Sequence, residues 1–203
     1  MRISAFVVLG VVLALLMSVV PISSVPLQRR KTIVNQDGSA YGATNSLEGM
    51  CDQAQLIIQA HVQTMFPARD KGEPPPGFPY LETDFILQVD RVLKGSNSIR
   101  EVAVTQRGGI NETQEQEVVG FPLMKIGEDR LFFLTGPDGV LKADGRPEVP
   151  NYQLIYGGAG TMLFELNATR LHSVVAFRAK YEGRAPAFLI SDIQSHIAAT
   201  EGK

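Results

Sequence analysis

Apolar positions recur along the chain with two different periods, and each change of period marks a predicted element. Asn45, with Glu48 three residues later, predicts the start of a short helix as a capping box. Residues 56–62 are β-branched and almost continuously apolar, so the helix is expected to lead directly into a buried strand. One face of the helix is indicated by apolar side chains at three-to-four-residue spacing, namely Leu47, Met50, Cys51 and Ala54.

The chain beyond residue 80 shows the two-residue alternation and the short apolar runs that are typical of strands. Turns that contain glycine, such as Gly95–Asn97 and Gly136–Gly139, separate these segments. Because no long helices alternate with them, the pattern favours a mainly β domain, as an antiparallel barrel or sandwich. The predicted strands are residues 83–94, 102–107, 130–134, 152–156 and 162–166, with one more short strand at Thr32–Val34.

A second helix is predicted near the end of the chain. Ser191 with Gln194 has the spacing of a capping box, and Gly202 is placed where a helix would stop. The apolar stripe of this helix is expected to consist of Ile193, Ile197 and Ala198.

Three segments are predicted to connect elements rather than to form them. Pro67–Pro79 holds five of the twelve prolines and is expected to be an exposed, extended loop. Gly108–Gly120 follows a predicted strand and is treated as a second loop, and residues 25–44 are a polar tether. Because binding residues usually lie on loops that a rigid scaffold presents, the first two segments are the expected contact surface.

The first 24 residues have the organisation of a secretory leader. Ile3–Val20 is an uncharged run of 18 residues, preceded by Arg2 and followed by small residues up to Ser24. This pattern predicts a signal peptide, residues 1–24, and an exported protein, periplasmic or extracellular. An uncleaved membrane anchor is the alternative, because 18 apolar residues can just span a bilayer and the basic run Arg29–Lys31 resists translocation.

Composition excludes several classes of function. A single cysteine is incompatible with an internal disulfide framework and with zinc sites that need several thiolates. The formal net charge is −2, and it becomes −3 without residues 1–24, which contain one base and no acid. A mildly acidic chain without a long basic stretch is not expected to bind nucleic acid.

Three segments of the chain carry a resemblance to a known family, namely Met50–Val62, Phe85–Gly95 and Gly127–Leu134. They resemble segments of the netrin-like modules found in netrins, complement components and tissue inhibitors of metalloproteinases. The same segments, with Gly108 and Gly109 between them, occur in uncharacterised exported bacterial proteins of similar size. The resemblance covers roughly residues 46–166 and implies an OB-like antiparallel β-barrel in a domain of residues 45–203, with a short helix before the first strand and a C-terminal helix.

The family's inhibitory mechanism does not carry over to this chain. Metalloproteinase inhibition uses an N-terminal cysteine whose amine and carbonyl chelate zinc, and no cysteine lies near the expected mature start. Cys51 aligns with an internal family cysteine, but its disulfide partner is missing. No functional residue is therefore transferred from the family.

Few residues are candidates for chemistry. A catalytic cysteine needs a base, and the histidines are limited to His61, His172 and His196. The position of Cys51 on an apolar stripe predicts a buried structural residue instead. The histidines lack metal-ligand spacing, so no metal site is predicted, although folding could bring them to Asp or Glu side chains. No catalytic, cofactor-binding or metal-binding residue is predicted.

Two local motifs have simple interpretations. Gly157–Gly160 has the look of a phosphate-binding loop, but the alternation that follows favours a hairpin or bulge. Asn111 and Asn167 each begin a glycosylation sequon, which matters in a eukaryotic secretory route.

These observations favour an exported, non-enzymatic interaction module that contacts an extracytoplasmic protein through Pro67–Pro79 and Gly108–Gly120. A hydrolase is one alternative, and it requires a pocket where acidic and histidine side chains converge only in the fold. A small-ligand carrier is the other, and it requires an open apolar cavity at the barrel mouth.

Overall fold

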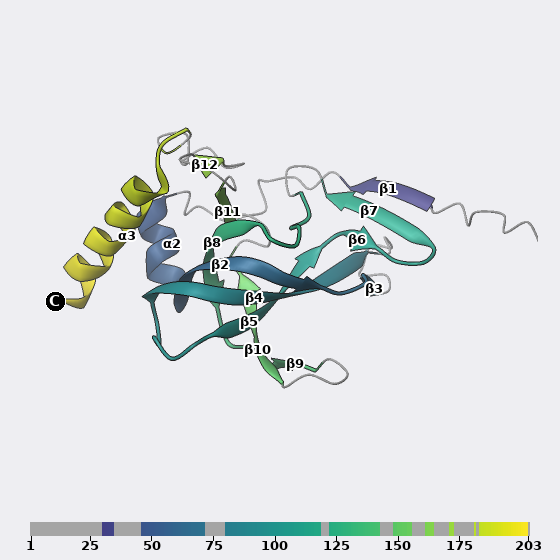
Figure 1. Ribbon diagram of the computed structural model, residues 1–203, viewed down its shortest axis with the longest axis horizontal. Helices are drawn as coiled ribbons and strands as arrows, with labels where there is room; N and C mark the ends of the chain where they lie inside the picture. The colour runs from purple at the N-terminus through teal and green to yellow at the C-terminus, as the bar shows by residue number, and fades with distance from the viewer. Residues whose placement is uncertain are drawn as a thin grey trace, which may run out of the picture.

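The protein is mainly β, with two helices and two sheets in the part of the chain that the computed structural model describes (Figure 1). The described residues are 30–34, 46–71, 80–118, 122–142, 148–155, 161–164, 171–172, 181 and 183–202. The helices are α2 (Leu47–Gln53) and α3 (Pro186–Glu201). The strands are β1 (Arg30–Val34), β2 (Leu56–Met65), β3 (Arg69–Asp70), β4 (Leu81–Lys94), β5 (Glu101–Arg107), β6 (Gly109–Ile110), β7 (Gln114–Val118), β8 (Asp129–Thr135), β9 (Val140–Leu141), β10 (Val149–Leu154), β11 (Thr161–Phe164) and β12 (Leu171–His172).

Five strands of the larger sheet pair in a closed ring. β2 pairs with both β4 and β8, β5 pairs with β4 and β10, and β10 pairs back to β8. The prediction of purely antiparallel pairing is wrong at one step of this ring, because β10 runs parallel to β5. The chain forms β7 and β8 between these two strands, which gives it the length that a parallel crossover needs.

The two faces of the central strands belong to separate clusters of buried side chains. One face packs inside the ring, where Phe85 and Phe132 are completely buried. The opposite face, which includes Ile57 and Phe133, is covered by α2 and α3. Burial on both faces explains why Leu56, Ile57 and Ile58 form a continuous apolar run, whereas beyond them the half-buried Gln59 and His61 alternate with buried apolar residues.

The helices pack against each other on one side of the sheet (Figure 1). The side chain of His196 on α3 lies 2.7 Å from that of Asp52 on α2, measured from Nε2 to Oδ1. Tyr181, which precedes α3, donates a hydrogen bond to Asp192 at 2.7 Å. These two contacts hold α3 beside α2, and both helices pack on the buried cluster that includes Ile57 and Phe133.

Both helices begin at residues other than the predicted ones. The N-cap of α2 is Ser46, whose Oγ accepts a hydrogen bond from the Gly49 amide, and Asn45 lies outside the described residues. The capping box predicted at Ser191 is wrong, because α3 begins five residues earlier, at Pro186. Proline at the first helical position needs no amide hydrogen bond, so it starts a helix without a side-chain cap.

The predicted end of α3 is confirmed, and its stripe is corrected. Gly202 is the C-cap, and Ile193 and Ile197 are buried as expected. Ala198 is exposed, and Leu189 takes its place in the buried stripe.

The smaller sheet has the order β1-β7-β6 and lies at the end of the molecule away from the helices (Figure 1). β1 confirms the short strand predicted at Thr32–Val34 and runs parallel to β7. The expected tether of residues 25–44 is therefore partly structured, whereas residues 25–29 and 35–44 lie outside the described part. Lys31 contacts the side chains of Glu115 and Glu117, each at 3.3 Å.

The predicted leader, residues 1–24, lies outside the described residues. Of the helices that the structure describes, neither combines the length and the apolar character that crossing a membrane requires.

Candidate functional site

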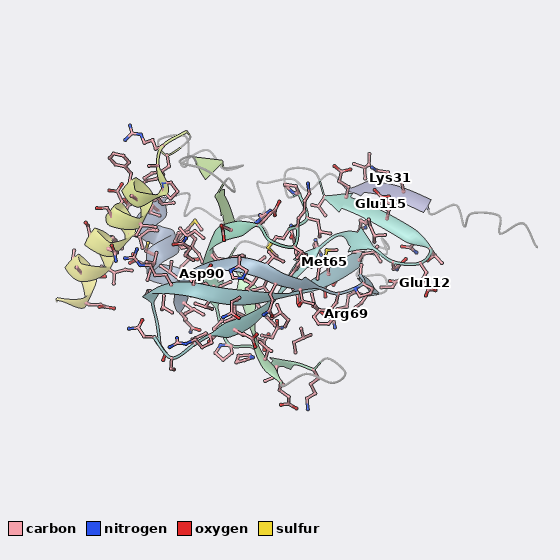
Figure 2. All side chains as sticks on the ribbon, in the orientation of Figure 1. Lys31, Met65, Arg69, Asp90, Glu112 and Glu115 are labelled. Carbon is pink, nitrogen blue, oxygen red and sulfur yellow. The ribbon has the colours of Figure 1, made fainter. Side chains whose placement is uncertain are left out.

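A cleft with a volume of about 710 Å³ opens where β2 ends and the smaller sheet begins. Its lining is mostly apolar, and two of its side chains, Met65 and Ile110, are 42% and 45% exposed. Figure 2 shows Met65, Arg69 and Glu112 toward the end of the molecule that lies away from the helices. We call this the β2–β6 cleft, and it is lined by Met65, Phe66, Pro67, Ala68, Thr83, Ile110, Asn111, Glu112 and Leu123.

The two walls of the cleft are joined by backbone contacts. The amide of Ala68 donates a hydrogen bond to the carbonyl of Ile110 at 3.0 Å. Below them, the hydroxyl of Thr83 donates to the carbonyl of Gly108 at 2.7 Å. Gly109 has φ +134°, and a Cβ atom there would collide with Thr83 and Ala68, so only glycine permits this close approach.

The first wall is held by an ion-pair network on β3 and β4. Arg69 donates a hydrogen bond to Asp84 at 2.7 Å, and Thr105 donates to the same carboxylate oxygen at 2.7 Å. Asp84 is buried, so this contact satisfies a charge that water does not reach. Lys71 adds a more exposed ion pair to Glu82 at 3.2 Å.

The second wall is the turn between β6 and β7. The side-chain oxygen of Asn111 accepts hydrogen bonds from the amides of Thr113 and Gln114, at 3.0 and 2.8 Å. This is the local bonding by which asparagine stabilises a turn, and it fixes Glu112 at the exposed tip.

The structure brings together the two segments that the sequence predicted as a contact surface. Pro67 and Ala68 lie on one side of the cleft, and Ile110 to Glu112 lie on the other. The description of Pro67–Pro79 as an exposed loop is wrong at its start, because Ala68 is buried and β3 pairs with β4. Residues 72–79 lie outside the described part. Gly108–Gly120 is likewise not a simple loop, since it contains β6 and β7.

The side chains that line the β2–β6 cleft are mostly apolar. Glu112 is the one titratable side chain among its lining residues, so the acid and base pair that the hydrolase alternative requires is not formed there. Among the described residues, large side chains such as Phe85 and Phe132 are completely buried inside the ring. The β2–β6 cleft is nevertheless large enough for a small apolar molecule.

Cys51 is a buried free thiol on α2, as its place on the apolar stripe predicts. Burial raises the pKa of this thiol from 9.0 to about 12, even though the positive charge of Lys94 acts in the opposite direction. A thiol that keeps its proton is a poor nucleophile.

The histidines have separate environments. His196 contacts Asp52 between the two helices, and the side chain of His172 lies outside the described part. His61 on β2 lies close to Asp90 on β4 and Asp129 on β8. Among the described residues, the donor atoms of His61, Asp90 and Asp129 lie close enough together to hold a metal ion.

Sequence reasoning missed both the cleft lining from β2 and the cluster around His61. The sequence held no clear signal for the cleft, because the exposure of Met65 at the end of β2 is visible only in the fold. The His61 cluster had no local signal, because its members come from three strands. Gly157–Gly160 and Asn167 lie outside the described residues.

Comparisons with protein-family models and with curated protein sequences find no match to this chain. Its function is therefore argued from its own residues.

Proposed function

We propose that this chain is an exported, non-enzymatic binding module that contacts an extracytoplasmic protein through the β2–β6 cleft. Its scaffold is then an OB-like β-barrel formed by β2, β4, β5, β10 and β8. The closed ring of pairings among these five strands supports the barrel, because OB-like domains are five-stranded Greek-key barrels that bind ligands through loops at their rim.

One observation carries the proposal: a mostly apolar cleft lies between two walls fixed by backbone hydrogen bonds, and it exposes Met65 and Ile110. Exposed apolar side chains that line a concave surface are typical of interaction sites. Because Glu112 borders the cleft, the expected partner inserts an apolar side chain and carries a basic residue beside it.

The test is capture of a partner by the chain from Val25 onward, with a photo-crosslinking residue at position 65, in the envelope or secretion fraction of its own cell. Ile110→Asp places a charge in the cleft and should weaken capture at least about tenfold, the effect of losing one anchor at an interface. The captured protein is identified by mass spectrometry. A glycan at Asn111 would cover the cleft, so the chain is produced in a host that does not add one.

The matched control is Val140→Asp on β9, where the side chain is also 45% exposed but does not line the cleft. It should leave capture unchanged. Equal loss of capture in both variants, or in neither, would contradict the cleft as the contact surface. Deleting all of Pro67–Pro79 is a poorer test, because it removes the buried Ala68 and β3.

A small apolar ligand is the second candidate, favoured by the cleft volume of about 710 Å³. It predicts that no protein is captured and that an apolar compound raises the melting temperature of the unmodified chain. The same compound should have no effect on Ile110→Asp and its full effect on Val140→Asp.

A further inference from the structure

Three side chains, those of His61, Asp90 and Asp129, form a cluster on the outer face of the larger sheet. This cluster lies away from the β2–β6 cleft. Figure 2 shows Asp90 on β4, nearer to the helices than the cleft residues Met65 and Arg69. β2 runs between β4 and β8, so His61 stands between the two aspartates. Their donor atoms all lie within 4.8 Å of one another.

The strand pairing explains why these three side chains meet. His61 is directly opposite Asp129 in the register of β2 and β8. On the other side, Ala60 pairs with Val89 while Gln59 pairs with Arg91, so Asp90 is the extra residue of a β-bulge. A bulge re-aims a side chain, and here Nδ1 of His61 lies 3.0 and 3.1 Å from the two carboxylate oxygens of Asp90.

The charges of the cluster are not balanced by a basic side chain. Asp129 is half-buried and has no lysine or arginine partner among the described residues. Arg130 follows it in the chain but points to the opposite face, where it is buried and paired with Glu128 at 2.7 Å. Within the described ranges, two carboxylates therefore approach one imidazole without a lysine or arginine paired to Asp129.

We propose that His61, Asp90 and Asp129 form a binding site for a divalent cation of the Zn²⁺ type. Bonds of about 2.0–2.2 Å place neighbouring tetrahedral ligands about 3.4 Å apart. Nδ1 of His61 lies 3.0 and 3.1 Å from the Asp90 oxygens, slightly closer than this spacing, and Asp129 lies within 4.8 Å, so side-chain shifts would bring all three to one ion. The imidazole nitrogen selects Zn²⁺ over Ca²⁺ and Mg²⁺, which prefer oxygen ligands alone. Three protein ligands leave the fourth position open to water or to a partner's side chain.

The test measures Zn²⁺ binding to the tag-free chain from Val25 onward by calorimetry against a competing chelator. One ion per chain is expected, with a rise in melting temperature of at least about 5 °C at a hundredfold excess over Kd. Asp129→Asn and His61→Gln should each weaken binding at least about tenfold, because even indirect partners of a metal contribute that much. Ca²⁺ should not compete.

The control is His196→Gln, which removes the other described histidine–aspartate contact but has no third ligand. It should bind Zn²⁺ like the unmodified chain. A value of Kd unchanged by Asp129→Asn, or changed equally by His196→Gln, would overturn the proposal.

A second readout separates a metal site from a simple ion pair. In a chelator, Asp129→Asn should be at least as stable as the unmodified chain, because it removes the repulsion between two carboxylates. With Zn²⁺ present, the unmodified chain should be more stable than Asp129→Asn. If Asp129 only formed an attractive contact with His61, the variant would be less stable in the chelator, and this result would also overturn the proposal.

Discussion

Cys51 shows how burial changes the chemistry of one residue. Its thiol is 1% exposed, and burial raises its pKa from 9.0 to about 12. At pH 8, three pKa units reduce the thiolate fraction about 1,000-fold. We therefore expect iodoacetamide to label the folded chain at least about 1,000-fold more slowly than the chain in urea, measured by mass spectrometry. Labelling of the folded chain within tenfold of the unfolded rate would contradict this assignment.

The same shift makes stability depend on alkaline pH. Below pH 9 the thiol keeps its proton in both the folded and the unfolded chain, so the free energy of unfolding is not reduced by its titration. Between pH 9 and 12 only the unfolded chain releases the proton, and the free energy of unfolding falls by up to about 1.4 kcal/mol per pH unit. Cys51→Ala lacks this titration, and the difference between the two pH profiles isolates it from Tyr152, whose pKa burial also raises.

At the scale of elements, β3 is a two-residue strand on which a wall of the cleft depends. Arg69 pairs there with the buried Asp84, so Arg69→Met leaves that carboxylate with Thr105 as its remaining side-chain donor in the described part of the chain. We expect the free energy of unfolding to fall by about 1–3 kcal/mol, the cost of a buried charge that loses a partner. Urea denaturation followed by circular dichroism measures it.

Lys71→Met is the matched control for this prediction. Lys71 lies two residues away and pairs at 3.2 Å with Glu82, whose side chain is 19% exposed, against 7% for that of Asp84. An exposed ion pair contributes less than about 1 kcal/mol, so this variant should be nearly as stable as the unmodified chain. Equal losses in both variants would show that the burial of Asp84 does not matter.

Elements with a strong local period were predictable from the sequence, and elements made by distant pairing were not. The helix face of Leu47, Met50 and Cys51 and the alternation of β4 are written into neighbouring residues. β3 was hidden in a proline-rich stretch, because it exists only through its pairing with Leu81 and Glu82. The cluster of His61 and Asp90 depends on a bulge and on a contact across 29 residues, which no local spacing reveals.

At the scale of the whole molecule, the two sheets differ in how they are held. The closed ring packs two faces of its strands in buried clusters, with side chains such as Ile57 and Phe132 completely enclosed. The described residues of the smaller sheet belong to none of these clusters, and Ile33 on β1 is 60% exposed, although Gln116 and Val118 on β7 are buried. The contacts of this sheet include surface pairs, where Glu115 and then Glu117 raise the pKa of Lys31. Fewer buried contacts mean a lower free energy of local opening.

Hydrogen exchange on the chain from Val25 onward tests this difference. Amides of β7 should open with a free energy at least about 2 kcal/mol lower than amides of residues 57–62 in β2, because local opening need not unfold the ring. Shortening the chain to residues 45–203 removes β1, and protection of β7 should fall further. The melting temperature should change by less than about 4 °C, since β1 pairs outside the ring. Equal protection of both strands, or loss of cooperative melting in the shortened chain, would show that the smaller sheet and the ring unfold as one unit.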